Sequence, residues 1–293
     1  MKKLLAMTMA LAMVLGLAAC GNGGGSSSSA GGSSASQSDA SGSQGDASTG
    51  SGSTGGEAVD LSDVLVEPGK LIMSTNAAFP PYEMVADGEG VYQGYEGIDV
   101  EIAVALADKL GLELQIDDMD FDAALMAVQN NAADVMLAGL SYSEERDENM
   151  DFTDPYATGI QVVIVPEGSE VTLDNVGEYM IGTQRGTTGF QYATDDYGEE
   201  HVIGYDNGAT AVQELINGTI DAVIIDNAPA QEYVAANPDA GLALLDGAWV
   251  EEDYCAAVDE GNTVLLDAIN AALNEMITDG TVQTIVDKYI TAE

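Results

Sequence analysis

The chain has 293 residues, of which 46% are hydrophobic and 19% charged, and its formal net charge is −43. The apolar fraction suits a globular protein, whereas the strong acidity excludes a nucleic-acid-binding protein, which needs a basic surface. Acidity also disfavours anionic ligands through long-range repulsion, which salt weakens. Solubility or a saline habitat explains the acidity more simply than any particular ligand does.

The first twenty residues have the pattern of a secretion signal. Lys2 and Lys3 precede an uncharged apolar run over 4–17, which is too short to span a bilayer as a mature helix. Small residues then lead to Cys20, and a cysteine at this point resembles the bacterial lipobox. We therefore expect a signal peptide over 1–19, cleavage before Cys20 and a lipid on its thiol, which would hold the protein on the extracytoplasmic face of the cell membrane. The alternative is an ordinary signal peptide with an incidental cysteine.

Residues 20–56 are predicted to be a disordered, lipid-anchored linker. After Cys20 this segment consists of Gly, Ser, Ala and Thr with a few acids, and it has no large apolar side chain. Such a composition cannot bury enough surface to offset the entropy of ordering. A flexible chain of this length has a mean reach of roughly 30–35 Å. Without Lys2 and Lys3, the mature chain has five cations against 50 acids, a net charge of −45.

From about residue 60 onwards, short apolar runs alternate with helical patterns. In the first helical pattern, Ile98, Ile102 and Leu106 recur every four residues on one face, and Gly111 follows its end. This alternation favours parallel sheets covered by helices. The predicted strands cover 71–75, 112–116, 134–138, 161–165, 179–183, 221–225 and 253–258, and further helices are predicted over 121–131, 209–217 and 262–290 with a break at Gly280.

Two segments resemble each other in residue type and spacing. Residues 130–137 match 217–224, and each segment follows a helix that contains Ala-Val-Gln. Asn131 and Gly218 stand where a left-handed residue commonly ends a helix. The match suggests two α/β lobes of similar design.

Four loops are expected to surround a ligand. Ligands of open parallel sheets bind beyond the carboxyl ends of the strands. This rule selects the loops 76–82, 139–146, 184–189 and 226–229, two from each predicted lobe.

Two of these loops have groups that suit an anion. The guanidinium of Arg146 offers paired donors to a carboxylate, and the backbone N–H of Ser141 can add to them. The alternative for Arg146 is a surface ion pair with Glu144 or Glu145. The segment Gly186-Thr187-Thr188-Gly189 allows close backbone approach and presents hydroxyl groups, although it lacks the lysine and spacing of a P-loop.

The remaining candidates suit an amine and a side chain. Asp226 ends a predicted strand and can bind an ammonium group or cap the following helix. Phe79, Tyr82 and Phe121 can flank an aliphatic or flat group, although the Tyr82 ring also suits a packing role alone. Donors for a carboxylate together with an acid for an amine describe a site for an α-amino acid.

Six segments, taken in chain order, carry a resemblance to a known family: NAAFPPYE (76–83), GIDVEIA (97–103), AGLSYSEER (138–146), DFTDPY (151–156), GTTG (186–189) and DAVIIDNAP (221–229). Together they resemble the polar amino acid-binding proteins of ABC importers (solute-binding family 3). The resemblance covers 65–290 and implies the type II periplasmic-binding-protein fold, an α/β fold of two lobes, each a mainly parallel sheet flanked by helices, joined by two hinge strands. Lobe 1 would comprise 65–157 and 250–293, and lobe 2 would comprise 158–249.

The resemblance also implies roles for individual residues. Arg146, Ser141 and Thr188 would bind the α-carboxylate of the ligand. Gly139 and Asp226 would bind its α-ammonium group.

The ligand's side chain would lie between Phe79 and Phe121, with Asn76 and Gln184 near its distal group. Family members that bind basic amino acids often have an acid at the position of Asn76. The asparagine argues against a strictly cationic substrate, whereas the acidity of the protein favours one.

The expected function is capture of a polar L-amino acid, a class that includes the basic ones, by lobe closure and delivery to the permease of an ABC importer. We expect a monomer with no cofactor, metal or enzymatic activity. Two alternatives are a sensor that reports amino acids to a membrane receptor and, less favoured, a dehydratase on the same fold.

Few residues suggest catalysis or metal binding. The single histidine, His201, cannot by itself complete a Ser/His/Asp constellation, and no zinc-ligand spacing occurs. The acidic residues at 117, 118, 120 and 122 lack the glycine and terminal glutamate of an EF-hand loop, so a solvated acidic face is expected. With Cys20 lipidated, Cys255 has no partner and is predicted to be a small buried residue.

Overall fold

The computed structural model describes residues 59–290. The predicted signal peptide, the anchor Cys20 and the predicted linker lie outside the described residues. Within 59–290, no helix combines the length and the apolar character needed to cross a membrane.

One half of the described structure, formed by the N-terminal part of the chain together with its C-terminal end, is built on a five-stranded sheet in the order β5-β1-β6-β14-β7. β1 pairs in parallel with β5 and β6, whereas β14 is antiparallel to β6 and β7. The strands are β1 (Lys70–Thr75), β5 (Glu113–Asp118), β6 (Val135–Met136), β7 (Met150–Phe152) and β14 (Ala257–Asp259). The helices are α1 (Ile98–Leu110), α2 (Phe121–Gln129), α3 (Glu144–Asp147), α7 (Thr263–Thr278) and α8 (Thr281–Tyr289). A small separate sheet consists of β2 (Ala78–Phe79), β3 (Glu83–Val85) and β4 (Tyr95–Glu96).

The second half is built on a six-stranded sheet in the order β10-β9-β11-β8-β12, with β13 also paired to β8. β9 is parallel to β10 and β11, whereas β8 is antiparallel to β11, β12 and β13. The strands are β8 (Ala157–Pro166), β9 (Ile181–Gln184), β10 (Val202–Tyr205), β11 (Ala222–Asp226), β12 (Leu242–Leu244) and β13 (Val250–Tyr254). The helices are α4 (Thr188–Tyr197), α5 (Gly208–Ile216), α6 (Asn227–Ala236) and the 3₁₀ turn η1 (Val176–Glu178).

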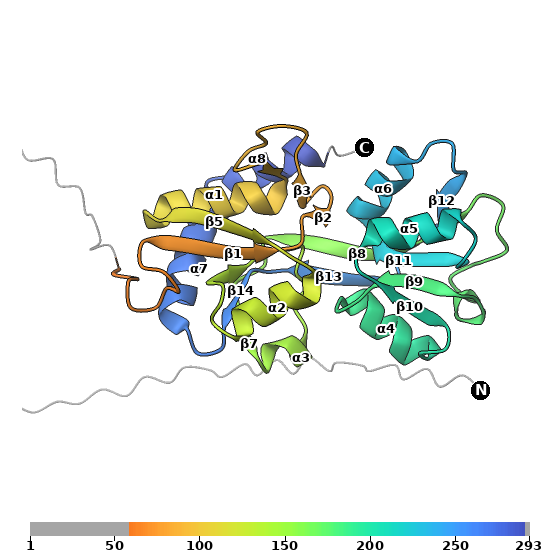
Figure 1. Cartoon of the computed structure of the whole chain (residues 1–293), viewed down its shortest axis with the longest axis horizontal. Helices are drawn as coiled ribbons and strands as arrows, with labels where there is room; N and C mark the ends of the chain where they lie inside the picture. Colours follow the sequence, from red (N-terminus) through yellow and green to blue (C-terminus); the bar gives the residue numbers. More distant parts are fainter. Residues whose placement is uncertain (1–58, 291–293) are drawn as a thin grey trace, which may run out of the picture. The chain divides into compact units, whose positions relative to one another are not determined.

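Two antiparallel strands, β8 and β13, connect the halves (Figure 1). The predicted boundary between the lobes lies between residues 249 and 250. In the structure, β13 begins at Val250 and pairs with β8 as far as Tyr254, so this boundary coincides with the start of a strand of the second sheet. The prediction of one continuous strand over 253–258 is wrong. The N–H of Cys255 donates to the carbonyl of Leu140 at 3.0 Å, so the chain leaves one sheet there and enters the other as β14.

Several local predictions agree with the structure. α1 buries Ile98, Ile102 and Leu106 and ends at the left-handed Gly111 (φ +68°). The left-handed residues Asn131 (φ +55°) and Gly218 (φ +74°) follow α2 and α5, as the internal similarity predicts. The C-terminal helical segment breaks into α7 and α8 around Gly280, and Cys255 is buried and free. Sheet pairing is more mixed than predicted, because β8, β13 and β14 run antiparallel to their neighbours.

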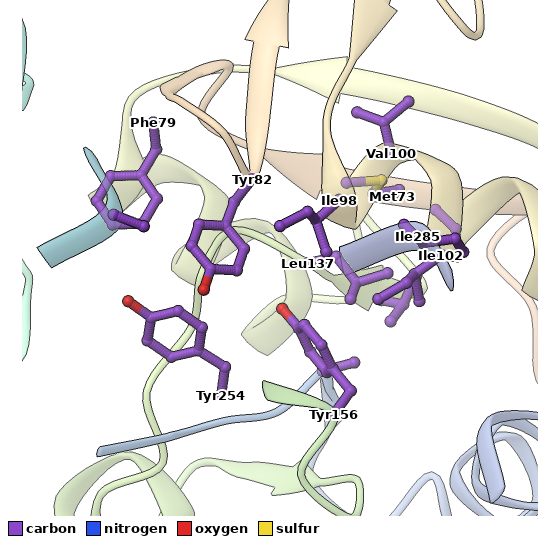
Figure 2. Close-up of a cluster of buried hydrophobic side chains, with 14 of the residues drawn as sticks. Met73, Phe79, Tyr82, Ile98, Val100, Ile102, Leu137, Tyr156, Tyr254 and Ile285 are labelled. Carbon is purple, nitrogen blue, oxygen red and sulfur yellow. The ribbon is translucent and has the colours of Figure 1, made fainter. Parts of the chain in front are cut away.

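A group of buried rings lies at the junction of the halves. Figure 2 shows Tyr82, Tyr156 and Tyr254 grouped between Phe79 and the aliphatic side chains around Ile98. Tyr82 meets Tyr254 edge-on at 5.0 Å between ring centroids. The hydroxyl groups of these tyrosines bring polar atoms into an otherwise apolar core.

Candidate ligand-binding site

A cavity lies between the halves, where β1, β6, β9 and β11 end. Of the eleven residues predicted to bind ligand, all except Tyr82 line it. Its wall consists of Asn76, Phe79, Glu83, Phe121, Ala138, Gly139, Ser141, Arg146, Gln161, Gln184, Thr187, Thr188, Ile224, Ile225 and Asp226.

The structure does not bring Tyr82 to the cavity wall. Its ring is buried, with its centroid 5.9 Å from that of Phe79 and 5.0 Å from that of Tyr254. Tyr82 therefore supports Phe79 from behind, which is the packing role that the sequence left open.

Arg146 is held in the cleft by backbone carbonyls of both halves. Its Nη1 donates to the carbonyl of Ser141 at 2.6 Å, and its Nη2 donates to that of Gly186 at 2.9 Å. Its guanidinium carbon lies 5.6 Å from the centre of the Phe121 ring. Burial lowers its pKa, but an arginine remains charged at neutral pH.

No acid of the described residues lies within ion-pair distance of Arg146, so the predicted alternative, a pair with Glu144 or Glu145, is not formed. The four other cations in 59–290 each pair with an acid: Lys70 with Glu67, Lys109 with Glu275, Arg185 with Asp206 and Lys288 with Glu101. Arg146 is thus a cation in the cavity wall that forms no ion pair with any described residue.

The hydroxyl groups of Ser141 and Thr188 converge on one carboxylate from opposite halves. Ser141 Oγ and Thr188 Oγ1 donate to Oε2 of Glu252 at 3.2 and 3.0 Å, and Gln161 Nε2 donates to the same oxygen at 2.9 Å. Glu252 belongs to β13 and was not predicted. These donors are therefore arranged around an internal carboxylate beside the cavity.

Thr187 shapes the loop before α4. Its Oγ1 accepts from the N–H of Phe190 at 3.2 Å, which caps the helix, and donates to the carbonyl of Gln184 at 2.8 Å. Because α4 begins at Thr188, the first N–H groups of that helix face the cavity end, where an anion is favoured.

Asp226 stands at the N-cap position of α6 but makes no capping hydrogen bond with its side chain. Its Oδ2 accepts from Gln161 Nε2 at 3.0 Å, and its Oδ1 has no donor among residues 59–290. Burial raises its pKa to about 7, and the charge of Glu252 contributes. An ammonium group in the cavity would supply the missing donor.

The aromatic wall depends on a glycine. Gly139 has a φ of +52°, and a Cβ at this position would lie 2.5 Å from Cε1 of Phe79. Glycine therefore lets the Phe79 ring rest on the backbone. Phe121 lies beside Arg146 and forms another part of the wall.

Asn76 and Gln184 connect the halves. Gln184 Nε2 donates to Asn76 Oδ1 at 3.0 Å, while Asn76 Nδ2 donates to the carbonyl of Met119 at 2.8 Å. Both side chains are buried, and both line the cavity.

Glu83, which was not among the predicted ligand-binding residues, lines the cavity and is 0% exposed. Neither of its carboxyl oxygens has a donor among the described residues. Burial raises its pKa well above the usual value, and the charge of Asp99 adds to this effect. The only sequence signal is its place in the 76–83 segment, directly after a buried tyrosine. Gln161 and Glu252 were also missed, and Gln161 could have been noticed as a polar residue that begins the apolar run QVVIV.

Within 59–290, no three His, Cys, Asp or Glu side chains are grouped so as to hold a metal ion. At the end of β5, Asp118 accepts a hydrogen bond from the N–H of Ala77 at 2.8 Å, and Asp117 accepts one from Gln115 at 3.0 Å. Asp117 and Asp118 therefore have structural partners of their own.

The family of bacterial extracellular solute-binding proteins, family 3, matches residues 71–292. A probable histidine-binding protein of Neisseria gonorrhoeae is 30% identical over 251 residues, which cover 82% of this chain and 90% of that protein. The ABC transporter arginine-binding protein 1 of Escherichia coli is 29% identical, with 75% and 90% covered.

Solved structures give the same result. The arginine-, lysine-, histidine-binding protein ArtJ of Geobacillus stearothermophilus is 30% identical with a TM-score of 0.71, and the match covers 76% of this chain and 96% of ArtJ. An ancestral arginine-binding protein bound to arginine is 38% identical with a TM-score of 0.70, and the match covers 76% and 98%. The predicted resemblance and the type II periplasmic fold are confirmed. Since these proteins bind solutes, the prediction that the chain is not an enzyme is confirmed as well.

Proposed function

Since the chain belongs to family 3 of the bacterial extracellular solute-binding proteins, we propose that it captures an α-amino acid with a cationic side chain. The observation that carries this proposal is a set of ionisable side chains in the cavity wall that lack a partner of opposite charge. Arg146 has no acidic partner, while Asp226 and Glu83 are buried acids with no cationic partner among the described residues. A ligand with one carboxylate and two cationic groups complements this pattern.

Each group of the ligand has a stated partner. The α-carboxylate binds the free N–H groups of Arg146 and the N-terminal end of α4, close to the hydroxyls of Ser141 and Thr188. The α-ammonium group binds Asp226. The side chain passes between Phe79 and Phe121, and its cationic end binds Glu83.

Asparagine at position 76 argued against a cationic ligand, because basic-specific family members often have an acid there. Glu83 supplies an acid from a different position of the same segment. Several relatives carry names that refer to arginine or histidine binding, which supports this choice, and one ancestral arginine-binding protein was also solved with glutamine. Neutral polar amino acids are therefore expected as weaker ligands.

Binding is a closure of two lobes, comprising 65–157 with 250–293 and 158–249. The proposed ligand contacts come from both halves, so only a closed protein satisfies all groups of the ligand. Direct bonds such as Gln184 to Asn76 and Arg146 to Gly186 join the two sides of the cleft in this structure. The strands β8 and β13 act as hinges.

Cys20, after its apolar leader, supports anchoring of the protein by lipid on the extracytoplasmic face of the membrane. The linker up to residue 56 would leave the lobes free to close while they stay near their partner. That partner is the permease of an ABC importer, which accepts the closed, loaded protein.

A thermal-shift screen of the twenty amino acids tests the proposed function. At a ligand concentration about a thousand times Kd, binding contributes about 4 kcal/mol, which corresponds to a rise in Tm of roughly 8–16 °C for a protein of this size. We expect the largest rises with arginine, lysine and histidine. No rise with any amino acid would overturn amino acid capture, and a rise with neutral amino acids alone would overturn the cationic preference.

A further inference from the structure

We propose that Glu252 is a positioning residue for the ammonium end of the ligand: its carboxylate binds the hydroxyl protons of Ser141 and Thr188, so that both hydroxyl oxygens accept from the α-ammonium group. This inference deepens the proposed function and rests on it. It changes the role of two hydroxyls that the resemblance assigned to the α-carboxylate, because a hydroxyl that donates to Glu252 cannot donate to the ligand as well.

Donors from three elements converge on a single oxygen of Glu252. Ser141 follows β6, Thr188 begins α4 and Gln161 belongs to β8, and they reach Oε2 at 3.2, 3.0 and 2.9 Å. Glu252 is 7% exposed, and its other oxygen, Oε1, has no donor among residues 59–290. Three donors directed at one oxygen favour the ionised form of a carboxyl group, so all three protons point toward Glu252.

The two hydroxyl groups lie between this carboxylate and the cavity. Ser141 and Thr188 line the cavity wall, whereas Glu252 is not among the described residues that line it. A hydroxyl group has one proton and two lone pairs. Because the proton is directed at Glu252, each oxygen has only lone pairs for a ligand, and these repel a carboxylate oxygen but bind an N–H donor. Glu252 therefore acts on the ligand through the two hydroxyls.

Gln161 places these hydroxyls on the same side of the site as Asp226. Its Nε2 donates to Oδ2 of Asp226 at 3.0 Å and to Oε2 of Glu252 at 2.9 Å, so both carboxylates contact one nitrogen. An amide oxygen in that place would face two carboxylate oxygens, which fixes the orientation of the amide. Oδ1 of Asp226 has no donor among the described residues. Asp226 and the two hydroxyl oxygens are thus acceptors gathered around one amide group.

The α-carboxylate of the ligand retains donors of its own. The backbone carbonyl of Ser141 accepts from Nη1 of Arg146 at 2.6 Å, while the Ser141 hydroxyl turns to Glu252. Ser141 therefore lies between the two ends of the site. The remaining N–H groups of Arg146 and the first N–H groups of α4 take no part in the contacts of Glu252, so they stay available to an anion.

This arrangement selects ligands that have an α-ammonium group. An ammonium group has three N–H donors and can bind Asp226 and both hydroxyl oxygens. An α-hydroxyl group in its place has a single proton, which Asp226 accepts, and Ser141 and Thr188 then receive no donor. Each hydrogen bond to the charged group contributes roughly 10- to 100-fold in affinity, so α-hydroxy acids with the same side chain should bind far more weakly.

Thr188→Val, a change of nearly the same shape, tests the role of the hydroxyl. The probes are L-arginine and its α-hydroxy analogue, 2-hydroxy-5-guanidinopentanoic acid, measured by calorimetric titration and displacement. We expect the variant to weaken L-arginine by about 10- to 100-fold and to leave the hydroxy acid nearly unchanged. Thr183→Val is the matched control, because the buried hydroxyl of Thr183 has no partner among the described residues and lies outside the cavity wall.

Two substitutions of Glu252 test the positioning directly and need only L-arginine. In Glu252→Gln an amide oxygen can accept from the same three donors, whereas Glu252→Leu removes the acceptor. We expect Glu252→Gln to bind L-arginine at least about tenfold more tightly than Glu252→Leu. If Glu252 served only as a counter-charge for Arg146, both variants would lose the same affinity.

The outcomes separate the inference from the proposed function. Equal weakening of both probes by Thr188→Val would show that the hydroxyl donates to the carboxylate, and it would overturn the inference while amino acid capture stands. Equal affinity of the two Glu252 variants would overturn it as well. An absence of binding by the unmodified protein with any amino acid, together with no thermal shift, would overturn both. Melting curves identify a variant that fails to fold, and the Thr188→Val comparison decides the matter if Glu252→Leu is such a variant.

Discussion

Replacing Arg146 by alanine is expected to abolish amino acid binding while the protein remains folded. The guanidinium is the cation of the described cavity wall, and no acid of the described residues pairs with it. Loss of one partner from a desolvated charge pair costs about 3–5 kcal/mol, which corresponds to a loss of affinity on the order of 10²- to 10⁴-fold for every amino acid. Calorimetric titration with arginine measures the effect.

The substitution removes donors from the carbonyls of Ser141 and Gly186 as well, which costs about 1–3 kcal/mol of stability. Circular dichroism and a melting curve check that the variant folds. Arg185→Ala is the matched control, because Arg185 forms an exposed pair with Asp206 and exposed pairs contribute about 0–1 kcal/mol. Full binding by Arg146→Ala would show that the carboxylate of the ligand lies elsewhere.

Asp226→Asn is expected to weaken binding of every α-amino acid by about 100-fold or more at pH 8. Asparagine has the same size and can still accept from Gln161, but it provides no negative charge for the α-ammonium group. Affinity should also change with pH. Because burial raises the pKa of Asp226 to about 7 in the free protein, the charge that attracts ammonium is present above pH 7 and is lost as the pH falls through that value.

The unmodified protein should therefore lose up to about tenfold in affinity for neutral amino acids per pH unit below 7, and Asp226→Asn should lose this dependence. Titrations with glutamine from pH 5.5 to 8.5 measure both slopes. Glu83→Gln provides the contrast, since it should weaken the binding of arginine and leave that of glutamine in place. A variant Asp226→Asn with unchanged affinity would mean that Asp226 only shapes the loop before α6.

Most of the cavity wall was predictable because its residues sit in loops that follow strands. Arg146, Thr188 and Asp226 each lie at, or a short way beyond, the carboxyl end of a strand, and the topology of the sheets brings such ends together. The left-handed ends at Asn131 and Gly218 were predictable for the same local reason, because residue type and helix length determine them.

The missed residues depend on packing between distant segments. Glu83 reads as an ordinary polar residue of a short strand, and it becomes a buried acid only because its segment lies on the N-terminus of α1, with Asp99 beneath it. Glu252 is one of two adjacent glutamates, and the pairing of β13 with β8 determines that it faces inward while Glu251 is exposed.

Tyr82 illustrates the opposite error. Its neighbour Phe79 lines the cavity, and because the two aromatic residues lie close together in the sequence, both were predicted to contact the ligand. The direction of each ring is determined by its contacts, and Tyr254 from β13 holds Tyr82 in the core. The break of the predicted strand 253–258 has a similar origin, because the change of sheet at Cys255 depends on a hydrogen bond to Leu140.

The most direct test of the account is a crystal structure of the protein with L-arginine. We predict that the α-carboxylate contacts Arg146, the α-ammonium group contacts Asp226 and the guanidinium contacts Glu83. A ligand bound in this cavity with its guanidinium remote from Glu83, or with its carboxylate remote from Arg146, would contradict the account.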